Sequence, residues 1–344
     1  MAAGMTTRLV HADQAGIEEA GALLAGGGIA AIPTETVYGL AACMRGPGVP
    51  EIFAAKGRPQ DNPLIVHIAD VSMLGQVVAA IPHAAMDLMD AFWPGPLSLI
   101  LKKNPGVPDT VSAGLDTVAV RMPAHPVARA IIRAAGEPLA APSANTSGRP
   151  SPTRAEHVLA DLNGRIPLIV DGGPCDVGVE STVLDLSGGY PTILRPGDIT
   201  AQQIRKVVPE IRIRRTAADD DAVPASPGMK YRHYAPSAQV VVLDGKPAHV
   251  AREVRQRYDY DREVRRHPRI LCADRRTDLF ADLDCRSLGQ GAADTEQRLF
   301  DELRRADIDG RDVIYFLYED DMGTAVRNRI LKAAAAAEGS ERAE

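Results

Sequence analysis

Two cations separated by a single glycine, Lys56 and Arg58, open the segment KGRPQDNPLIVHI over residues 56–68. Pro59 and Pro63 stiffen the loop that follows, because each proline fixes φ and removes a backbone donor. A lysine presents a point charge and an arginine a planar fork of donors, and together they suit a polyanion such as a triphosphate. Taken alone, the two charges leave open the alternative of a solvated basic turn.

Arginine also stands at the end of two apolar segments, and a proline follows closely each time. The alternating run over residues 117–122 contains Arg121, and the run over residues 190–194 leads into Arg195. A cation inside an apolar strand requires a counter-charge, because burying an unpaired charge is very costly. For Arg121 the partner is either a structural ion pair or an anionic substrate, and the pattern favours neither.

Hydroxyl and amide side chains gather in two loops that follow short apolar segments. Thr34 and Thr36 flank Glu35 directly after the predicted strand over residues 29–32, a placement that suits a small polar ligand. Capping of a following helix is the alternative, since threonine is a fair N-cap residue. The loop over residues 142–148 is rich in small residues, which let a ligand approach the backbone closely, although many such loops are plain turns.

The sequence offers no convincing pair of nucleophile and base. Ser143, Ser181 and His67 are present, but no G-x-S-x-G segment accompanies them, and no cluster of His, Cys and carboxylates has metal-ligand spacing. Anion-binding side chains without a nucleophile act through positioning and charge stabilisation. Phosphoryl or nucleotidyl transfer demands little more, usually with Mg²⁺ on the phosphates. We therefore expect nucleotide chemistry, with no metal ligands from the chain and no tightly bound organic cofactor.

The composition is that of an ordinary globular protein with room for two domains. The chain has 344 residues, 45% of them apolar and 24% charged, and a formal net charge of −6. The negative balance argues against wholesale wrapping of nucleic acid. Widely spaced cysteines fit a reducing cytoplasm, and no signal peptide or apolar run of roughly 18 residues is recognisable. We expect a cytoplasmic protein.

Strands and helices that alternate along the chain must position these side chains. In the first part, hydrophobic periodicity predicts a helix over residues 13–24, and the glycines and prolines predict a loop over residues 43–50. From residue 239 the alternation is regular, which predicts a small parallel sheet in layers. The expected division is a catalytic domain over residues 1–211, a linker over residues 212–236 and a C-terminal α/β domain over residues 237–344.

The second half of the linker differs from a simple spacer. An acidic, alanine-rich run over residues 217–225 precedes the segment SPGMKYRHYAP at residues 226–236. A flexible segment rich in aromatic and cationic groups is able to close over a ligand bound elsewhere. We expect Tyr231, His233 and Tyr234 to provide this closure.

Seven segments, taken in order, resemble the threonylcarbamoyl-AMP synthase family (YrdC-like). The linker and the extra domain are similar to the long, two-domain form of that family. The resemblance implies a YrdC-like twisted mixed sheet with flanking helices, followed by a small Rossmann-like parallel α/β domain. The segments are PTETVYGL at 33–40, KGRP with NPLIVHI within 56–68, FWPGPLSLIL at 92–101, TVAVRMPAHP at 117–126, APSANTSGRPSPT at 141–153, ESTVLDL at 180–186 and LRPG at 194–197.

The family makes L-threonylcarbamoyl-AMP and pyrophosphate from L-threonine, bicarbonate and ATP, a nucleotidyl transfer that supplies threonylcarbamoyladenosine to tRNAs reading codons that begin with A. Carried over by motif, Lys56 and Arg58 would be catalytic and would hold the ATP phosphates with Asn62. The implied threonine site consists of Thr36, His67, Arg121, Ser143 and Ser181. The nucleotide side adds Thr117, Ser143, Asn145, Ser151, Arg195, Tyr231, His233 and Tyr234.

The resemblance also implies Mg²⁺ bound with ATP and transient contact with the tRNA threonylcarbamoyl transferase machinery, without membrane attachment or stable nucleic-acid binding. Two other interpretations stay open. An RNA-binding module for ribosome or tRNA maturation predicts a broad basic face. A carbamoyl transferase subdomain, like the related domains of hydrogenase maturation proteins, predicts an added zinc-finger-like region, for which the scattered cysteines offer no pattern.

Overall fold

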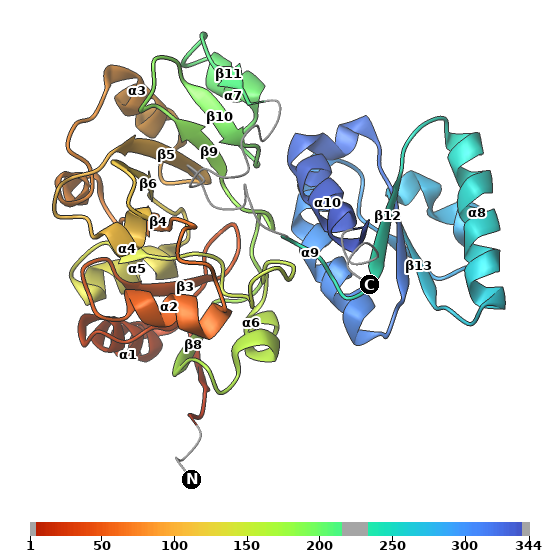
Figure 1. Ribbon diagram of the computed structural model, residues 1–344, viewed down its shortest axis with the longest axis horizontal. Helices are drawn as coiled ribbons and strands as arrows, with labels where there is room; N and C mark the ends of the chain where they lie inside the picture. Colours follow the sequence, from red (N-terminus) through yellow and green to blue (C-terminus); the bar gives the residue numbers. More distant parts are fainter. Residues whose placement is uncertain (1–4, 215–232, 339–344) are drawn as a thin grey trace. The chain divides into compact units, whose positions relative to one another are not determined.

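The computed structural model describes residues 5–214 and 233–338. Within these residues the chain forms two compact units (Figure 1). Each unit has a sheet of its own, and each is described by itself. The described part of the first unit comprises residues 5–147, 151–176 and 180–214, and that of the second comprises residues 148–150, 177–179 and 233–338.

The first unit is built on one sheet, whose described strands follow the order β1-β8-β2-β3-β7-β4-β6-β5-β9-β10-β11. Neighbours pair in both directions: β4 runs parallel to β6, while β5 runs antiparallel to β6 and parallel to β9. The strands are β1 Arg8–His11, β2 Ala30–Ile32, β3 Gly39–Cys43, β4 Ile65–His67, β5 Leu97–Lys102, β6 Thr117–Arg121, β7 Leu139–Ala140, β8 Leu168–Asp171, β9 Thr182–Asp185, β10 Thr192–Arg195 and β11 Arg212–Ile213.

Helices cover both faces of this sheet (Figure 1). Helix α1 begins after Asp13, whose carboxylate accepts a hydrogen bond from the Gly16 N–H at 2.9 Å. Together with α5 it packs its apolar side chains on β2, β3, β7 and β8, while α2, α3 and α6 contribute to the larger core on the other face. The helices are α1 Gln14–Ala25, α2 Val49–Lys56, α3 His83–Phe92, α4 Asp109–Ser112, α5 Pro126–Ala135, α6 Ala155–Leu162 and α7 Ala201–Arg205.

The face that α1 and α5 cover continues over β4, β6, β5 and β9 as a small apolar floor. Side chains alternate across a strand, so Ile65 of β4 and Ala119 of β6 point away from the larger core. They form a separate cluster with Ile100 and Val183, and all four of these buried residues belong to strands. Polar side chains of the same strands flank this floor, which marks it as a candidate ligand-binding surface.

The second unit is a four-stranded sheet in the order β12-β15-β13-β14, with every pair parallel. Helix α8 lies on one face of the sheet, and α9 and α10 lie on the other (Figure 1). Alternate residues of β15 explain the layering, since Val313 and Tyr315 share an apolar cluster with Val250 and Val254 of α8. The elements are β12 Gln239–Leu243, α8 Pro247–Glu263, β13 Pro268–Cys272, β14 Cys285–Ser287, α9 Ala292–Ile308, β15 Val313–Leu317 and α10 Gly323–Glu338.

The predicted fold class is confirmed: a mixed sheet with flanking helices is followed by a small parallel α/β unit. Two local predictions were wrong. Residues 43–50 are not all loop, because Cys43 ends β3 and Pro50 sits in the first turn of α2, where its missing N–H costs nothing. Residues 212–213, expected in the linker, pair with β10 as strand β11.

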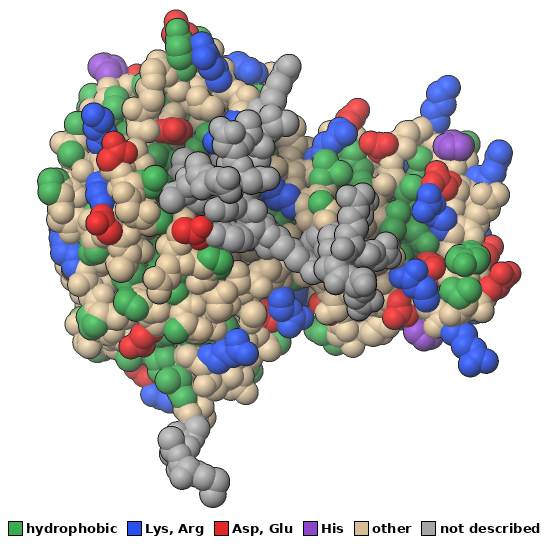
Figure 2. Space-filling model, in the orientation of Figure 1, with side chains coloured by type: hydrophobic (Ala, Val, Ile, Leu, Met, Phe, Trp, Pro, Cys, Tyr) green, Lys and Arg blue, Asp and Glu red, His purple; other side chains and the backbone are tan. Residues whose placement is uncertain are grey.

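The described surface and helices bear on the partner predictions. No helix within the described ranges combines the length and the apolarity that a bilayer crossing requires. On the face shown in Figure 2, the coloured cationic and anionic side chains are interspersed over both units. The coloured part of this face therefore does not show the broad basic surface that an RNA-binding module would present.

Candidate active site

The turn between β2 and β3 is held by the hydroxyl of Thr34. This hydroxyl donates to the Val37 carbonyl oxygen at 2.6 Å and accepts from the N–H groups of Thr36 and Val37 at 3.3 Å. The alternative in which these threonines cap a helix is wrong, because the segment leads directly into β3. The turn instead presents the side chains of Glu35 and Thr36 toward the end of β6.

Arg121, at the end of β6, joins this turn to the loop before β5. Its Nη1 donates to the Thr36 hydroxyl at 2.9 Å, and its Nε donates to the Gly95 carbonyl oxygen at 3.2 Å. Its Nη2 lies 2.6 Å from Oε1 of Glu35, and the exposed fractions of the two side chains are only 4% and 7%. The required counter-charge of Arg121 is therefore supplied by the protein itself, and the guanidinium is fixed in place before any ligand arrives.

The charge states at this end of the sheet are set by burial and by Arg121. Burial by itself would raise the pKa of Glu35, but the charge of Arg121 and its hydrogen bond outweigh that effect and leave the pKa below its ordinary value. His67 pairs with Arg121 in the β4–β6 register. Burial first, and the Arg121 charge second, lower the pKa of His67 to about 3. The site therefore holds an ionised Glu35 and a neutral imidazole at neutral pH.

The neutral His67 has a defined hydrogen-bonding role. Its Nδ1 lies 3.2 Å from the Ile65 carbonyl oxygen. A carbonyl oxygen only accepts, so this contact assigns the proton to Nδ1 and leaves Nε2 as an acceptor. The site thus combines a cation, an anion and a neutral acceptor within one buried cluster.

Lys56, the last residue of α2, is almost completely buried, with a relative exposure of 2%. Its Nζ donates to the backbone carbonyl oxygens of Ser143 and Asn145. The Ser147 N–H in turn donates to the Lys56 carbonyl oxygen at 2.9 Å. The chain turns away directly after the lysine because Gly57 adopts a left-handed conformation with φ of 61°. The ammonium is thereby held against the small-residue loop that follows β7.

That small-residue loop is fastened to the Glu35 turn and to itself. The Ala144 N–H donates to the Tyr38 carbonyl oxygen at 2.8 Å. Within the loop the Ser143 hydroxyl donates to Oδ1 of Asn145 at 2.6 Å, and Nδ2 of Asn145 donates to the Thr146 carbonyl oxygen at 2.8 Å. Thr36 and Ser143, both predicted for the threonine site, thus lie in two adjacent loops.

Arg58 is used differently from a simple phosphate clamp. Its guanidinium donates to the Asn62 carbonyl oxygen at 3.2 Å and to the Pro63 carbonyl oxygen at 2.9 Å, and it is buried. These bonds hold the proline-stiffened loop in one conformation. The side chain Oδ1 of Asn62 is buried without a hydrogen-bond donor among the described residues. Burying an amide oxygen without a hydrogen-bond donor costs free energy. This atom is therefore a candidate acceptor for a donor from a bound ligand or a water molecule.

Ser181 and Arg195 lie together at the ends of β9 and β10. The Ser181 hydroxyl is 2.7 Å from the Ser98 hydroxyl, and Arg195 donates to the carbonyl oxygen of Ser181 at 3.1 Å and to its hydroxyl at 3.2 Å. All three side chains are buried. Immediately upstream, the Ser151 hydroxyl donates to the carboxylate of Glu180. This group lies beside the loop that Arg121 contacts, because the Thr182 N–H donates to the Pro96 carbonyl oxygen at 3.0 Å.

Thr117 stands at the opposite end of β6 from Arg121, four positions earlier. Residues two apart share a face of the sheet, so Thr117, Ala119 and Arg121 all point to the same side. Four residues of strand span about 13 Å, which is long enough for an elongated ligand to lie across the apolar floor. The floor residue Ala119 lies between the two polar side chains.

The linker residues divide between described and undescribed parts of the chain. Tyr231 lies outside the described residues. Tyr234 is buried within the second unit, where its ring centroid is 5.4 Å from that of Phe300 and 5.5 Å from that of His233. The predicted closure over a ligand stays a prediction.

Sequence reasoning missed three functional contacts. It noted Glu35 but not its pairing with Arg121, and it did not single out Glu180 or Tyr38. The Tyr38 hydroxyl donates to the Gly173 carbonyl oxygen at 2.7 Å and accepts from the Gly172 N–H at 3.1 Å. A sequence signal existed for Glu35, because it is the only carboxylate in the segment over residues 33–40. Its partner depended on tertiary packing that no local pattern reveals.

Comparison with known proteins agrees with this geometry. A family model described as "Telomere recombination" (Sua5/YciO/YrdC) matches residues 22–197, and the model of the threonylcarbamoyl-AMP synthase C-terminal domain matches residues 199–335. The threonylcarbamoyl-AMP synthase of Bacillus subtilis is 45% identical over 92% of each chain. That of Pyrococcus abyssi is 45% identical over 89% of this chain and 90% of its own.

Solved structures show the same relationship. The crystal structure of Pyrococcus abyssi Sua5 complexed with L-threonine is 42% identical and covers 96% of this chain and 98% of its own, with a TM-score of 0.88. A structure of a variant of the same protein gives a TM-score of 0.90 at 40% identity, over 96% and 97% of the two chains. Both units are included in these matches. The chain therefore belongs to the Sua5/YrdC family of threonylcarbamoyl-AMP synthases.

Proposed function

We propose that this chain condenses L-threonine, bicarbonate and ATP into L-threonylcarbamoyl-AMP and pyrophosphate, and so acts as a nucleotidyltransferase. The observation that carries the proposal is a preorganised set of buried cations at strand ends and in the adjoining loops, without a nucleophile among them. Lys56 and Arg121 are both held by protein oxygen atoms before any ligand binds. Family membership gives the identity of the reaction, because relatives of nearly equal length are named as synthases.

The threonine side of the proposal rests on Arg121 and its neighbours. The guanidinium would bind the threonine carboxylate, since a planar fork of donors matches a carboxylate. Thr36 and His67 lie against the same guanidinium, and Nε2 of the neutral imidazole would accept a hydrogen bond from the substrate. Ser143 and Ser181 would complete this end of the site from the neighbouring loops.

The nucleotide side would extend from Lys56 across the apolar floor. Lys56, Arg58 and Asn62 would hold the phosphates, with the buried oxygen of Asn62 meeting a bound water or an N–H or O–H donor. The remaining nucleotide contacts would come from Thr117, Ser143, Asn145, Ser151, Arg195, Tyr231, His233 and Tyr234. The apolar floor around Ala119 would then support the nucleoside.

Mg²⁺ would enter with ATP. Two buried carboxylates of the candidate site are already engaged, Glu35 with Arg121 and Glu180 with Ser151. Mg²⁺ commonly keeps several waters and binds through substrate phosphates, which fits a site whose carboxylates are occupied. When bound, the ion would neutralise charge on the phosphates, and no carboxylate cage from the chain would be needed.

The reaction needs no covalent intermediate with the protein. The threonine amine adds to bicarbonate and loses water, which forms a carbamate. A carbamate oxygen attacks the α-phosphorus of ATP, the bond from that phosphorus to the bridging oxygen breaks, and pyrophosphate leaves. Lys56 and Arg58 would stabilise the charge that develops on the leaving group. The product would serve tRNA modification in the cytoplasm, delivered by transient contact with the transferase that consumes it.

Threonine-dependent release of pyrophosphate from ATP, with bicarbonate and Mg²⁺, tests the proposal. Lys56→Ala should lower the rate by about 100-fold, the loss seen when one preorganised charge donor is removed. Lys206→Ala removes an exposed lysine of the same unit and should leave the rate unchanged. Release that is indifferent to threonine would refute the assigned acceptor, and full activity in Lys56→Ala would refute the phosphate role.

A further inference from the structure

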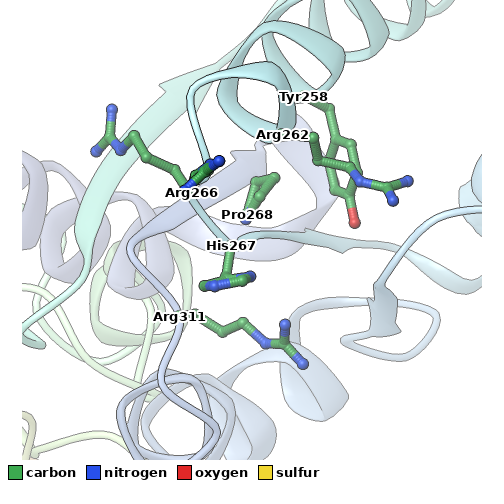
Figure 3. Close-up of a pocket in the computed structure, with 7 residues that line it drawn as sticks. Tyr258, Arg262, Arg266, His267, Pro268 and Arg311 are labelled. Atoms are coloured by element: carbon green, nitrogen blue, oxygen red, sulfur yellow. The ribbon is translucent and has the colours of Figure 1, made fainter.

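The second unit contains a cavity of about 590 Å³ at the end of α8 and the start of β13. None of the residues that line it belongs to the proposed active site. Figure 3 shows a lining dominated by cations. The residues are Tyr258, Arg262, Arg265, Arg266, His267, Pro268 and Arg311.

The cations of this cavity differ in how they are used. Arg266 pairs with Asp261 at 3.3 Å and donates to Gln239 at 2.9 Å. The side chains of Arg262 and Arg265 make no hydrogen bond or ion pair with any residue in the described part of the chain. Two arginines of the lining are thus available to a ligand, whereas the Arg266 side chain is already bonded to Asp261 and Gln239.

The polar groups around Arg262 converge on one side of the cavity. Figure 3 shows the Tyr258 hydroxyl and the guanidinium groups of Arg262 and Arg311 on the same side, while Arg266 points the other way. The Tyr258 hydroxyl accepts from the Asp284 N–H at 3.0 Å, so its own proton remains free to donate. Arg311 lies 3.0 Å from Asp284, which orients it. The hydroxyl and both guanidinium groups can donate hydrogen bonds, and they come from two segments, α8 and the residues before β15.

A structural role explains only part of the cluster. Cations at the C-terminal end of a helix complement its partial negative charge, and Arg262 and Arg265 lie at the end of α8. That role does not require Arg311, which comes from the segment before β15, nor the ring of His267. Convergence of cations from separate segments around a cavity indicates a ligand rather than a helix cap.

We propose that this cavity binds a small phosphorylated anion that carries several phosphate groups, such as a nucleoside polyphosphate or inorganic polyphosphate. Arginine matches phosphate oxygens with paired donors. The volume lies within the range of small-molecule sites. A nucleic-acid backbone would present the same phosphate chemistry, but the net charge of −6 disfavours the broad electrostatic footprint that such binding needs. The site would respond to phosphate metabolites independently of the proposed active site.

Calorimetric titration of the full chain with inorganic tripolyphosphate at low salt tests this proposal. Lys56→Ala serves as the background, which removes the proposed phosphate contact in the first unit. In that background, Arg262→Gln should weaken binding at least about tenfold, the loss of one charged hydrogen bond. Arg252→Gln is the matched control, because Arg252 is an exposed arginine of α8 outside the cavity lining. Folding should survive in Arg262→Gln, since that side chain has no partner in the described residues.

The outcomes separate clearly. Equal isotherms for Arg262→Gln and Arg252→Gln would overturn the proposal, and so would absence of binding in the Lys56→Ala background. A parallel titration with a short single-stranded RNA distinguishes the source of the phosphate. Loss of RNA binding in Arg262→Gln, with tripolyphosphate binding unchanged, would overturn the small-anion assignment in favour of a nucleic-acid backbone. Failure of the proposed synthase activity would leave each of these results unaffected.

Discussion

Replacing Arg121 by glutamine should destabilise the first unit strongly, and the cause can be separated from the loss of activity. The substitution leaves Glu35 buried without its cation, a situation that costs about 3–5 kcal/mol. For a unit of this size each kcal/mol corresponds to roughly 2–4 °C, so we expect the melting temperature to fall by roughly 6–20 °C. The same variant should raise the KM for threonine by roughly 10–150-fold, since one charged hydrogen-bonded partner of the carboxylate is lost.

The assay can report on the first unit alone. Trp93 is the only tryptophan of the chain, it is buried, and its Nε1 donates to the Leu97 carbonyl oxygen at 2.7 Å. Its fluorescence during urea or thermal unfolding therefore follows the sheet that carries Arg121. The difference in stability between wild type and Arg121→Gln should also become smaller at acid pH. The wild-type Glu35 pKa lies below 4.5, so the stability it contributes is present above that value and is lost as the pH falls.

The double variant Glu35→Gln/Arg121→Gln supplies the decisive comparison. Removing both charges abolishes the unpaired carboxylate, so most of the lost stability should return, while threonine use should stay impaired. A double variant no more stable than Arg121→Gln would refute the ion-pair reasoning. A double variant with a normal KM for threonine would show that Arg121 does not hold the substrate carboxylate.

Two further predictions follow from other buried charges. The pKa of His67 falls to about 3 in the folded chain from 6.5, so the unfolded chain binds more protons between these values and stability declines as pH falls from 7. Between pH 7 and pH 5 this group should lower the free energy of unfolding by about 2 kcal/mol. His67→Gln should remove that part of the pH dependence in urea titrations monitored by Trp93 fluorescence. Arg269 is buried and pairs with Asp284 at 3.1 Å and with Asp309 at 2.7 Å. Arg269→Leu should therefore lower the urea concentration at which the second unit unfolds, as measured by circular dichroism, and leave the Trp93 transition of the first unit in place. An equal shift of the Trp93 transition would refute this prediction.

Much of the fold followed from periodic patterns, because those patterns depend on local geometry. The α1 helix was predicted from the periodicity of its apolar residues, and the regular alternation after residue 239 predicted the parallel sheet. Short edge elements were not recognised. Strands β1, β11 and β14 have two to four residues each, and their pairing partners rather than their own sequences make them strands.

The candidate site was predicted by residue type more fully than by role. Lys56, Arg58, Arg121 and Arg195 were predicted to be anion binders, and all four are buried in the structure, while their ligand stays a prediction. The alternatives left open for Arg121 depended on whether Glu35 packs beside it, and that contact joins residues 86 positions apart. Arg58 similarly bonds to backbone carbonyl oxygens of its own loop, an arrangement that only the loop conformation determines.

The strand order has a consequence for the synthesis of the protein on the ribosome. β5 pairs with β9 so that Leu97 faces Thr182, and Lys56 meets the carbonyl oxygen of Ser143, 87 residues later. A nascent chain that ends before β9 therefore exposes β5 as an open edge, which invites pairing with other chains. Contacts of such long range also form slowly. A first unit truncated before β9 is therefore expected to aggregate, besides lacking Ser181 and Arg195 of the candidate site.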